Sequence, residues 1–342
     1  MKILTYRESG QEKLAMVVDG LIYDLELVCQ SVQEVKVITP PHFFDRAIAG
    51  FRLVDLMAMD ESGLRILRRV ENYIRWVKTS GDPFLLRRAL RQEEHIEWLP
   101  PIPTPPVLFG IGGNSPLFFR NKSYQIPAYP RGFIRPTNSH ALLGHRSRVT
   151  IPTQYSTMRA SAELGVVIGR AGRNIAPANA MDYVWGYTLV NDMCSDAWKV
   201  VALGDKDESL MHKDLTIFTQ RAATSYFSRS TDGFAAVGPY VVTKEEVPDP
   251  YNLMVWNRLS GLPRERGLTQ AMVNGIDRTV SFLSRIFTLQ PGMIFHMGTM
   301  GIDGYTIEAD MRLGCNDYFE IEYEGIGVLR NYINDLRPNG CS

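Results

Sequence analysis

Two acidic residues stand at the ends of apolar segments, where a carboxylate is costly to bury without a partner. Glu163 opens one such segment and Asp192 closes another. If both segments are strands, alternation places Ser161 on the face of Glu163, and Cys194 on the face of Asp192. Neighbouring strands would then bring the two carboxylates to one pocket. Such a pair either shares a hard cation such as Mg²⁺, or the pKa of one member is raised.

The same residues allow other interpretations. Each carboxylate could instead cap a turn or pair with a nearby Arg or Lys. Cys194, two residues after Asp192, could act as an acyl-accepting nucleophile, although small buried cysteines are common. His296 is a poor partner for this thiol, because strand alternation places it on the face opposite Met297 and Thr299.

No familiar nucleotide-binding or hydrolase signature accompanies these residues. The segment Gly110–Gly113 is rich in glycine, but it lacks the GxGxxG spacing and no helical pattern follows it. We interpret it as a close-packed turn after a strand. The sequence has no Walker A, GxSxG or HExxH motif, and its six histidines never stand at helical ligand spacing.

The composition is that of a large globular chain. It has 342 residues, 45% of them hydrophobic and 22% charged, which excludes wholesale disorder. Lys plus Arg and Asp plus Glu both number 37, so the formal net charge is zero and nucleic-acid binding is disfavoured. The four cysteines form no CxxC or zinc-ligand pattern, and the N-terminus lacks a signal-peptide pattern. No apolar run is long enough to span a membrane, and we expect a cytoplasmic protein.

The elements that must position the two carboxylates lie in the second part of the chain. Five prolines between Leu99 and Pro106 cannot continue a helix or a central strand, and they predict a stiff connector. We therefore predict a small α+β domain over residues 1–98, a connector over 99–106 and a β-rich domain over 107–342.

Periodicity predicts the individual elements. Apolar stripes predict helices over Leu64–Val77 and Val273–Ile286, and a third helix is expected over Pro83–Trp98. Asp19-Gly20 predicts a hairpin turn. Because βαβ alternation is absent, a mixed barrel- or sandwich-like fold is favoured over a doubly wound sheet. Strands are predicted at Lys2–Tyr6, Leu14–Val18, Leu21–Asp24, Val107–Gly110, Ala162–Ile168, Val184–Asp192, Gly238–Val242, Met254–Leu259, Met293–Met297 and Tyr318–Tyr323.

Several segments, taken in order, resemble the fumarylacetoacetate hydrolase family. The resemblance covers most of the chain, and the N-terminal strands also resemble that family's small N-terminal domain. It implies a β-rich α+β fold whose catalytic domain is a mixed β-barrel or roll. The matching segments are Ala162–Gly169, Ala180–Asp192, Val237–Pro239, Leu289–Gly292, Gly298–Thr299 and Glu324–Asn331.

The resemblance also implies an activity. Family members cleave C–C bonds in 1,3-dicarbonyl acids, or decarboxylate or isomerise related keto-acids, usually as homodimers. A divalent cation, commonly Mg²⁺ or Ca²⁺, acts on the enolate oxygens, while a His–Glu pair activates water and a Lys holds negative charge. Here the resemblance implies Glu163 and Asp192 as metal ligands, and Gly298 and Thr299 as substrate contacts. The expected partners are a small-molecule substrate and a second copy of the chain, with no nucleic acid or membrane.

The sequence departs from the family pattern at four positions. Ser161 stands at the first Glu of the metal strand, and Phe118 stands at the water-activating His. Asn121 falls near the Glu partner of that His, and Arg229 falls at the Lys. Losing one carboxylate of three lowers the charge that holds a cation, and Phe118 cannot take a proton from water. We therefore expect a degraded site for metal binding and water activation.

Three hypotheses follow. The first is a divergent enzyme that acts on a β-dicarbonyl or keto-acid by non-hydrolytic enolate chemistry, such as C–C bond formation, cyclisation, decarboxylation or tautomerisation. The second is a conventional metal-dependent C–C hydrolase of 1,3-dicarbonyl acids, with a third metal ligand from elsewhere. The third is a non-catalytic binding protein on the same fold. The residues expected to act are Asp192, Arg229 and Cys194 in catalysis, and Asn114, Phe118, Gly298 and Thr299 in substrate binding.

Overall fold

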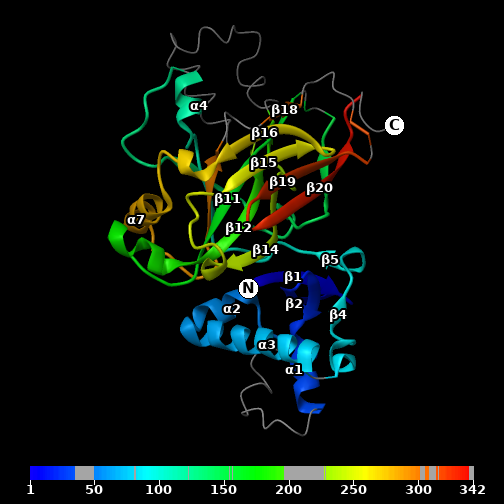
Figure 1. The fold of residues 1–342 in the computed structure, drawn as a ribbon. Coiled ribbons are helices and arrows are strands. Elements are labelled where there is room, and N and C mark those ends of the chain that lie inside the picture. The colour runs from blue at the N-terminus through cyan, green and yellow to red at the C-terminus, as the bar shows by residue number, and fades with distance from the viewer. Residues whose placement is uncertain are drawn as a thin grey trace.

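Twelve strands of the described residues form one sheet that runs through both parts of the chain in this computed structural model (Figure 1). The main path has the order β4-β3-β2-β1-β14-β12-β11-β17-β6-β7, with β5 on β1 and β8 on β14. The structure describes residues 1–34, 50–80, 82–121, 123–153, 155, 157–195, 227, 229–300, 305–307, 313–314 and 316–338. The strands of this sheet are β1 (Lys2–Glu8), β2 (Gln11–Val18), β3 (Leu21–Asp24), β4 (Leu90–Arg91), β5 (Glu97–Trp98), β6 (Leu108–Ile111), β7 (Gly132–Arg135), β8 (Leu142–Leu143), β11 (Ala162–Ile168), β12 (Val184–Asp192), β14 (Ala235–Thr243) and β17 (Ile294–Thr299).

Two smaller sheets complete the β structure of the described residues. One has the order β16-β15-β19-β20-β9 and the other the order β13-β10-β18. Their strands are β9 (Arg148–Ile151), β10 (Met158–Ala160), β13 (Cys194–Ser195), β15 (Met254–Leu259), β16 (Leu262–Leu268), β18 (Tyr305–Ile307), β19 (Tyr318–Tyr323) and β20 (Gly327–Asp335).

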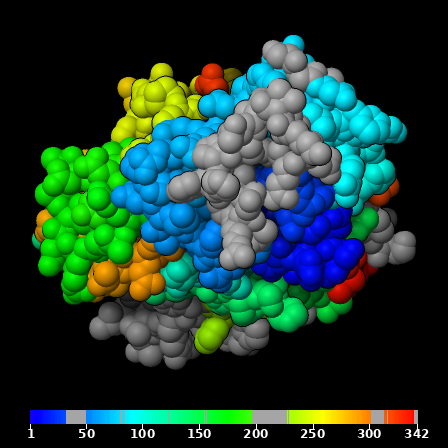
Figure 2. Space-filling view, turned by 90° about the horizontal axis from the view of Figure 1, so that it is seen from below, coloured from blue at the N-terminus to red at the C-terminus, as the bar shows by residue number. Residues whose placement is uncertain are grey.

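Helices lie on the outside of the sheets (Figure 1). Figure 2 shows the underside of the molecule, where the blue residues of α2 and α3 lie between green residues on one side and the cyan residues around position 90 on the other. The α-helices are α1 (Leu25–Glu34), α2 (Leu53–Ala58), α3 (Glu61–Ser80), α4 (Pro116–Asn121) and α7 (Ile276–Ile286). The 3₁₀ helices are η1 (Pro83–Leu86), η2 (Glu93–His95), η3 (Pro177–Tyr183), η5 (Lys244–Glu246) and η6 (Thr269–Ala271).

The central strands β11 and β12 are buried along their whole length. Near-continuous apolar runs of this kind are typical of strands covered on both faces. Alternate residues of β11 belong to different cores: Val166 packs with the five-stranded sheet, and Val167 packs with the core that α3 covers. Glu163 lies four residues before Val167, so alternation along the strand puts both side chains on the same face of β11. This is the face away from the five-stranded sheet.

The N-terminal segment is joined to the rest of the chain by backbone and side-chain contacts. Strand β1 pairs with β14, and the amino group of Met1 contacts Thr243 Oγ1 at 3.0 Å and Glu246 Oε1 at 2.9 Å. The proline segment 99–106 contains no helix or strand, as expected. The division into two domains at this segment stays a prediction.

The β-rich α+β class is confirmed, and ten predicted strands have a counterpart among the described strands. The helix predicted over Pro83–Trp98 is wrong. That segment is broken into η1, β4, η2 and β5, because Leu90 and Trp98 pair with the N-terminal strands instead of forming a helical stripe. A short helix, α4, also follows the glycine-rich segment where none was expected.

Cys29 and Cys194 are buried free thiols, and burial raises the pKa of Cys29 to about 12. Cys315 and Cys341 lie outside the described residues. Across the helices that the structure describes, none combines the length and the apolar character needed to cross a membrane.

Glu93 ties the N-terminal segment to the loop before β9. Its Oε1 accepts hydrogen bonds from His145 Nε2 at 3.1 Å and from Arg146 at 3.0 Å. His145 Nδ1 accepts from the backbone N–H of Arg330, so Nε2 carries the proton. The bond from His145 lowers the pKa of Glu93 most, and although burial opposes the shift, the pKa falls to about 2.

We predict that Glu93→Gln reduces the acid sensitivity of folding. The pKa of about 2 in the folded protein lies below the ordinary glutamate pKa of 4.5. The stabilisation that the Glu93 carboxylate gives to the folded protein is therefore fully present above the ordinary pKa. It is lost as the pH falls towards the pKa of the folded protein. Thermal melts followed by circular dichroism should show a gap in Tm between wild type and variant that narrows from about pH 6 to about pH 3. A gap that is constant over this range would contradict the assignment.

Candidate active site

The two carboxylates singled out in the sequence meet at the adjoining ends of β11 and β12. The strands are antiparallel neighbours with Glu163 opposite Val190, and the backbone N–H of Asp192 donates to the carbonyl of Ser161 at 3.0 Å. Glu163 is 3% exposed and Asp192 is 2% exposed. Their predicted convergence on one site is confirmed, because a shared register puts both on one face of the sheet.

A bulge brings His296 to the same site. His296 of β17 is opposite Gly165 of β11, and Thr299 is opposite Glu163. A stretch of three residues along β17 is therefore paired with two residues along β11. The extra residue lies where Gly298 has a φ of 75°. Because Glu163 and Gly165 share a face, the bulge puts His296 and Thr299 on that face as well. The expectation that His296 faces away from Thr299 is therefore wrong, since it assumed unbroken alternation.

Glu163 is held by two donors. His296 Nδ1 lies 2.5 Å from Glu163 Oε2, and the backbone N–H of Gly298 donates to the same oxygen at 2.9 Å. Burial raises the pKa of Glu163, His296 opposes the shift, and the negative charge of Asp192 adds to it. Nε2 of His296 has no hydrogen-bond partner among the described residues, so Glu163 is the group that orients the ring.

Asp192 is held by two arginines. Arg135, the last residue of β7, donates to Oδ1, and Arg229, which precedes β14, donates to Oδ2. Burial alone would raise the pKa of Asp192, but the guanidinium groups of Arg229 and Arg135 outweigh it, and the pKa is lowered. Asp192 is therefore a carboxylate anion at neutral pH.

The residue types fit a divalent cation. Glu163, Asp192 and His296 each offer one ligand atom, these atoms lie within 4.8 Å of one another, and all three residues are buried. Carboxylate and imidazole together suit Mn²⁺ and similar ions as well as Mg²⁺. His296 offers a third ligand atom beside the two carboxylates, so the expected degradation of the metal site is not supported.

A cavity of about 200 Å³ opens beside this group. Its walls include the expected residues Phe118, Cys194, Arg229, Gly298 and Thr299, together with Asn114, Ser161, Glu163, Asp192 and Phe133. The predicted residues are therefore brought together, and their individual roles stay proposals. Cys194 lies in this wall. The Nδ1 atom of His296 is hydrogen-bonded to Glu163, so it is not available to activate the thiol of Cys194.

Asn114 acts as a clamp in this wall. Its Nδ2 donates to the carbonyls of Met297 at 2.8 Å and Asn274 at 3.0 Å, and its Oδ1 accepts from the backbone N–H of Asn274. One hydrogen bond of the amide group thus fixes the strand that carries His296 and Gly298, and the other fixes the segment before α7. In this structure, Asn114 positions the site through the backbone of β17.

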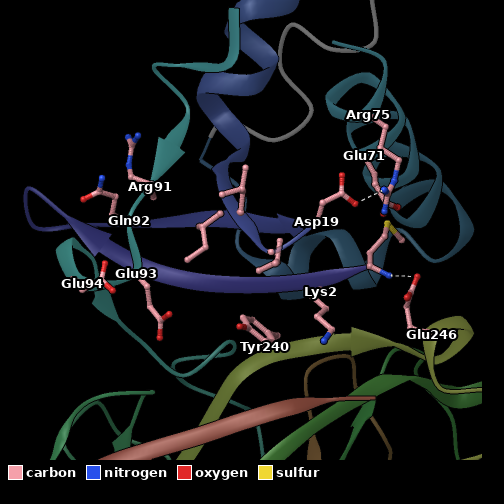
Figure 3. A pocket seen from close by; sticks show the side chains of 15 residues that line it. Lys2, Asp19, Glu71, Arg75, Arg91, Gln92, Glu93, Glu94, Tyr240 and Glu246 are labelled. Atoms are coloured by element: carbon pink, nitrogen blue, oxygen red, sulfur yellow. Dashed lines mark hydrogen bonds and ion pairs between the residues drawn. The ribbon is translucent and has the colours of Figure 1, made fainter. Parts of the chain in front are cut away.

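A larger cavity lies beside the N-terminal strands and β14 (Figure 3). It measures about 730 Å³. Several of its charged residues neutralise one another, since Asp19 binds Arg75, Arg75 binds Glu71, and Glu246 binds the amino group of Met1. Glu163 and Asp192 line the smaller cavity, and His296 is bonded to Glu163, so the smaller cavity is the candidate active site.

Comparison with known proteins decides the family. Residues 109–334 match the family described as fumarylacetoacetate (FAA) hydrolase C-terminal. The chain belongs to the fumarylacetoacetate hydrolase family. A putative hydrolase of Burkholderia lata is 27% identical to this family member over 339 residues, which is 98% of this chain and 100% of the relative.

Solved structures share the fold of this fumarylacetoacetate hydrolase family member over nearly its full length. Maleylpyruvate hydrolase from Sphingobium sp. SYK-6, in complex with manganese(II) and pyruvate, has a TM-score of 0.64 and 19% identity, covering 98% of this chain and 99% of that one. The 5-carboxymethyl-2-hydroxymuconate delta-isomerase from Mycobacterium smegmatis has a TM-score of 0.60 and 18% identity, covering 98% and 99%. The solved structures that share this fold thus include a hydrolase and an isomerase.

Sequence reasoning missed two residues of the site in this family member. His296 interrupts the apolar run Met293–Met297. A polar side chain is costly to bury without a partner, and this argument, which singled out Glu163, could also have singled out His296. Arg135 lies in β7, which was not predicted, and 57 residues separate it from Asp192. A contact between residues this far apart leaves no periodic pattern in the local sequence.

We predict that Gly110→Ala disrupts the His296–Glu163 pair. A Cβ at position 110 would lie 2.2 Å from His296 Cε1 and 2.4 Å from Nε2. Moving a packed ring typically costs about 1–3 kcal/mol, so the free energy of unfolding in urea should fall by that amount. Gly112→Ala is the matched control, because its Cβ meets only Arg131 O at 3.8 Å. Equal stability of the two variants would contradict this geometry.

Proposed function

We propose that this chain is a divalent-cation-dependent enzyme that hydrolyses or isomerises a keto-acid or 1,3-dicarbonyl acid. The observation that carries the proposal is the buried Glu163–Asp192–His296 group beside a cavity of about 200 Å³. Membership of the fumarylacetoacetate hydrolase family supports it. A structural relative that contains manganese(II) and pyruvate supports both the cation and a keto-acid substrate.

The site residues divide the work between holding the cation and holding the substrate. Glu163, Asp192 and His296 would hold the cation, which when bound supplies Lewis-acid polarisation of carbonyl or enolate oxygens. Arg229 lines the cavity, and its forked guanidinium is suited to a carboxylate or an enolate. Phe118 and Phe133 form an apolar wall that keeps bulk water away from the charged end.

A second candidate keeps this substrate class but not hydrolysis. Phe118 lines the cavity at the position where the resemblance expects a water-activating histidine, and a phenyl ring cannot accept a proton. Enolate chemistry without attack by water, such as tautomerisation or decarboxylation, needs no such base. The wall formed by Phe118 would protect the enolate from protonation by bulk water.

We predict one Mn²⁺ or Mg²⁺ site per chain that depends on Glu163. Chelator-treated protein should bind the ion in a calorimetric titration, and Glu163→Gln should weaken binding at least tenfold, about 1.4 kcal/mol, because it removes a charged ligand. Glu320→Gln is the matched control. Glu320 is also nearly buried and paired with arginines, but it belongs to β19, outside the ligand group.

The same preparations, assayed with acylpyruvates and β-keto-acids, separate the candidate functions. Cation-dependent loss of the dicarbonyl absorbance, with cleavage products seen by chromatography, is the expected result. Isomerised or decarboxylated product without cleavage would select the second candidate. Turnover by protein that binds no cation would contradict the cation requirement, and ligand binding without any turnover would indicate a binding protein.

A further inference from the structure

Both oxygens of Asp192 are already occupied. Arg135 donates to Oδ1 and Arg229 to Oδ2, and Asp192 is 2% exposed. Each oxygen keeps a second lone pair, so a cation could still bind to it, but it would then lie next to a guanidinium group and the two positive charges would repel each other. Buried carboxylates are rarely released without a replacement charge, because an unpaired anion in this environment is strongly unfavourable.

The two arginines differ in how firmly they are held. The side chain of Arg135 is 2% exposed, and besides Asp192 it donates to the carbonyl of Arg229 and approaches that of Met193 at 3.4 Å. The side chain of Arg229 is 29% exposed and lines the cavity. Among the described residues, Asp192 is the acceptor of its guanidinium, which also lies 4.7 Å from the centre of the Phe133 ring. Arg229 is therefore the arginine that can leave.

The carboxylates of the site are already matched by positive charge without a metal. Glu163 and Asp192 carry at most two negative charges, Arg135 and Arg229 carry two positive charges, and Arg159 adds a further guanidinium group to the cavity wall. A divalent cation added to this arrangement would face two guanidinium groups on its own ligand, and this repulsion falls when one of them moves away. The cavity beside Arg229, lined by Asn114 and Thr299 among others, gives that guanidinium a place to go.

We propose that Arg229 is an exchangeable counter-ion of Asp192. In the cation-free enzyme it neutralises Oδ2, and when a divalent cation takes this oxygen the guanidinium turns into the cavity, where it binds an anionic group of the substrate. This inference rests on the proposed function, since it assumes that the Glu163–Asp192–His296 group holds a cation. Arg229 is then a residue that couples loading of the cation to binding of the substrate.

The first test is calorimetric titration of chelator-treated protein with Mn²⁺ alone. Arg229→Gln should bind Mn²⁺ at least tenfold more tightly than wild type, because the competing guanidinium is gone. Arg258→Gln is the matched control: this arginine also pairs with carboxylates, Glu320 and Glu322, but on the five-stranded sheet. It should bind Mn²⁺ as wild type does. Circular dichroism confirms that each variant is folded.

The second test uses wild type alone, so it does not depend on the folding of a variant. Phenylglyoxal modifies accessible guanidinium groups, and mass spectrometry of the digested protein measures modification at Arg229. Saturating Mn²⁺ should raise the rate at Arg229 several-fold and leave the rate at Arg258 unchanged. Through-space repulsion without displacement would raise the affinity of Arg229→Gln for Mn²⁺ but would not change this rate.

The outcomes separate the exchange from the proposed function. If wild type and Arg229→Gln bind Mn²⁺ equally well, or if labelling at Arg229 does not respond to bound Mn²⁺, the exchange is overturned while the cation site stands. If neither protein binds Mn²⁺, the cation requirement itself is overturned, and the exchange with it.

Discussion

The carboxylate of Asp192, buried between two guanidinium groups, is the interaction on which the site depends. A charge in this environment requires partners of opposite sign at hydrogen-bonding distance. One partner comes from β7 and the other from the segment before β14, so Asp192 links elements that are far apart in the sequence. The twelve-stranded sheet provides the rigid frame that holds these elements in place (Figure 1).

The second constraint is the bulge in β17. Without the extra residue near Gly298, strict alternation would separate His296 and Thr299 onto opposite faces. With it, the imidazole reaches Glu163, and the backbone N–H of Gly298 reaches the same oxygen. Asn114 fixes this irregular backbone by binding the carbonyl of Met297. A local departure from regular sheet geometry thus completes the buried Glu163–Asp192–His296 group, although comparison with the family pattern, one residue at a time, predicts a degraded site.

Much of the frame was predictable from the sequence, because its central strands are continuous apolar runs. Ala162–Ile168 and Val184–Asp192 have the predicted bounds, and their register brings Glu163 and Asp192 together as expected. Strand β16 was missed because it is an exposed edge strand that contains Pro263 and several charges. The segment 83–98 was predicted as a helix because its pairing with β1 and β3 is long-range and leaves little local pattern.

The site itself was only half predictable. Burial cost singles out a carboxylate in an apolar strand, so Glu163 and Asp192 could be found one residue at a time. His296 and Arg135 depend on a bulge and on a strand that has no strong pattern, and both are properties of the assembled sheet. The catalytic, substrate-binding and cation-binding roles of the individual residues remain proposals that follow from this geometry.

The most direct measurement is anomalous X-ray diffraction from crystals of the protein grown with and without Mn²⁺. The account predicts an Mn²⁺ peak between Glu163, Asp192 and His296, with Arg229 on Asp192 in the crystals without Mn²⁺ and turned into the cavity in the crystals with it. An Mn²⁺-soaked crystal without a peak at these residues, in which both arginines remain on Asp192, would contradict the account.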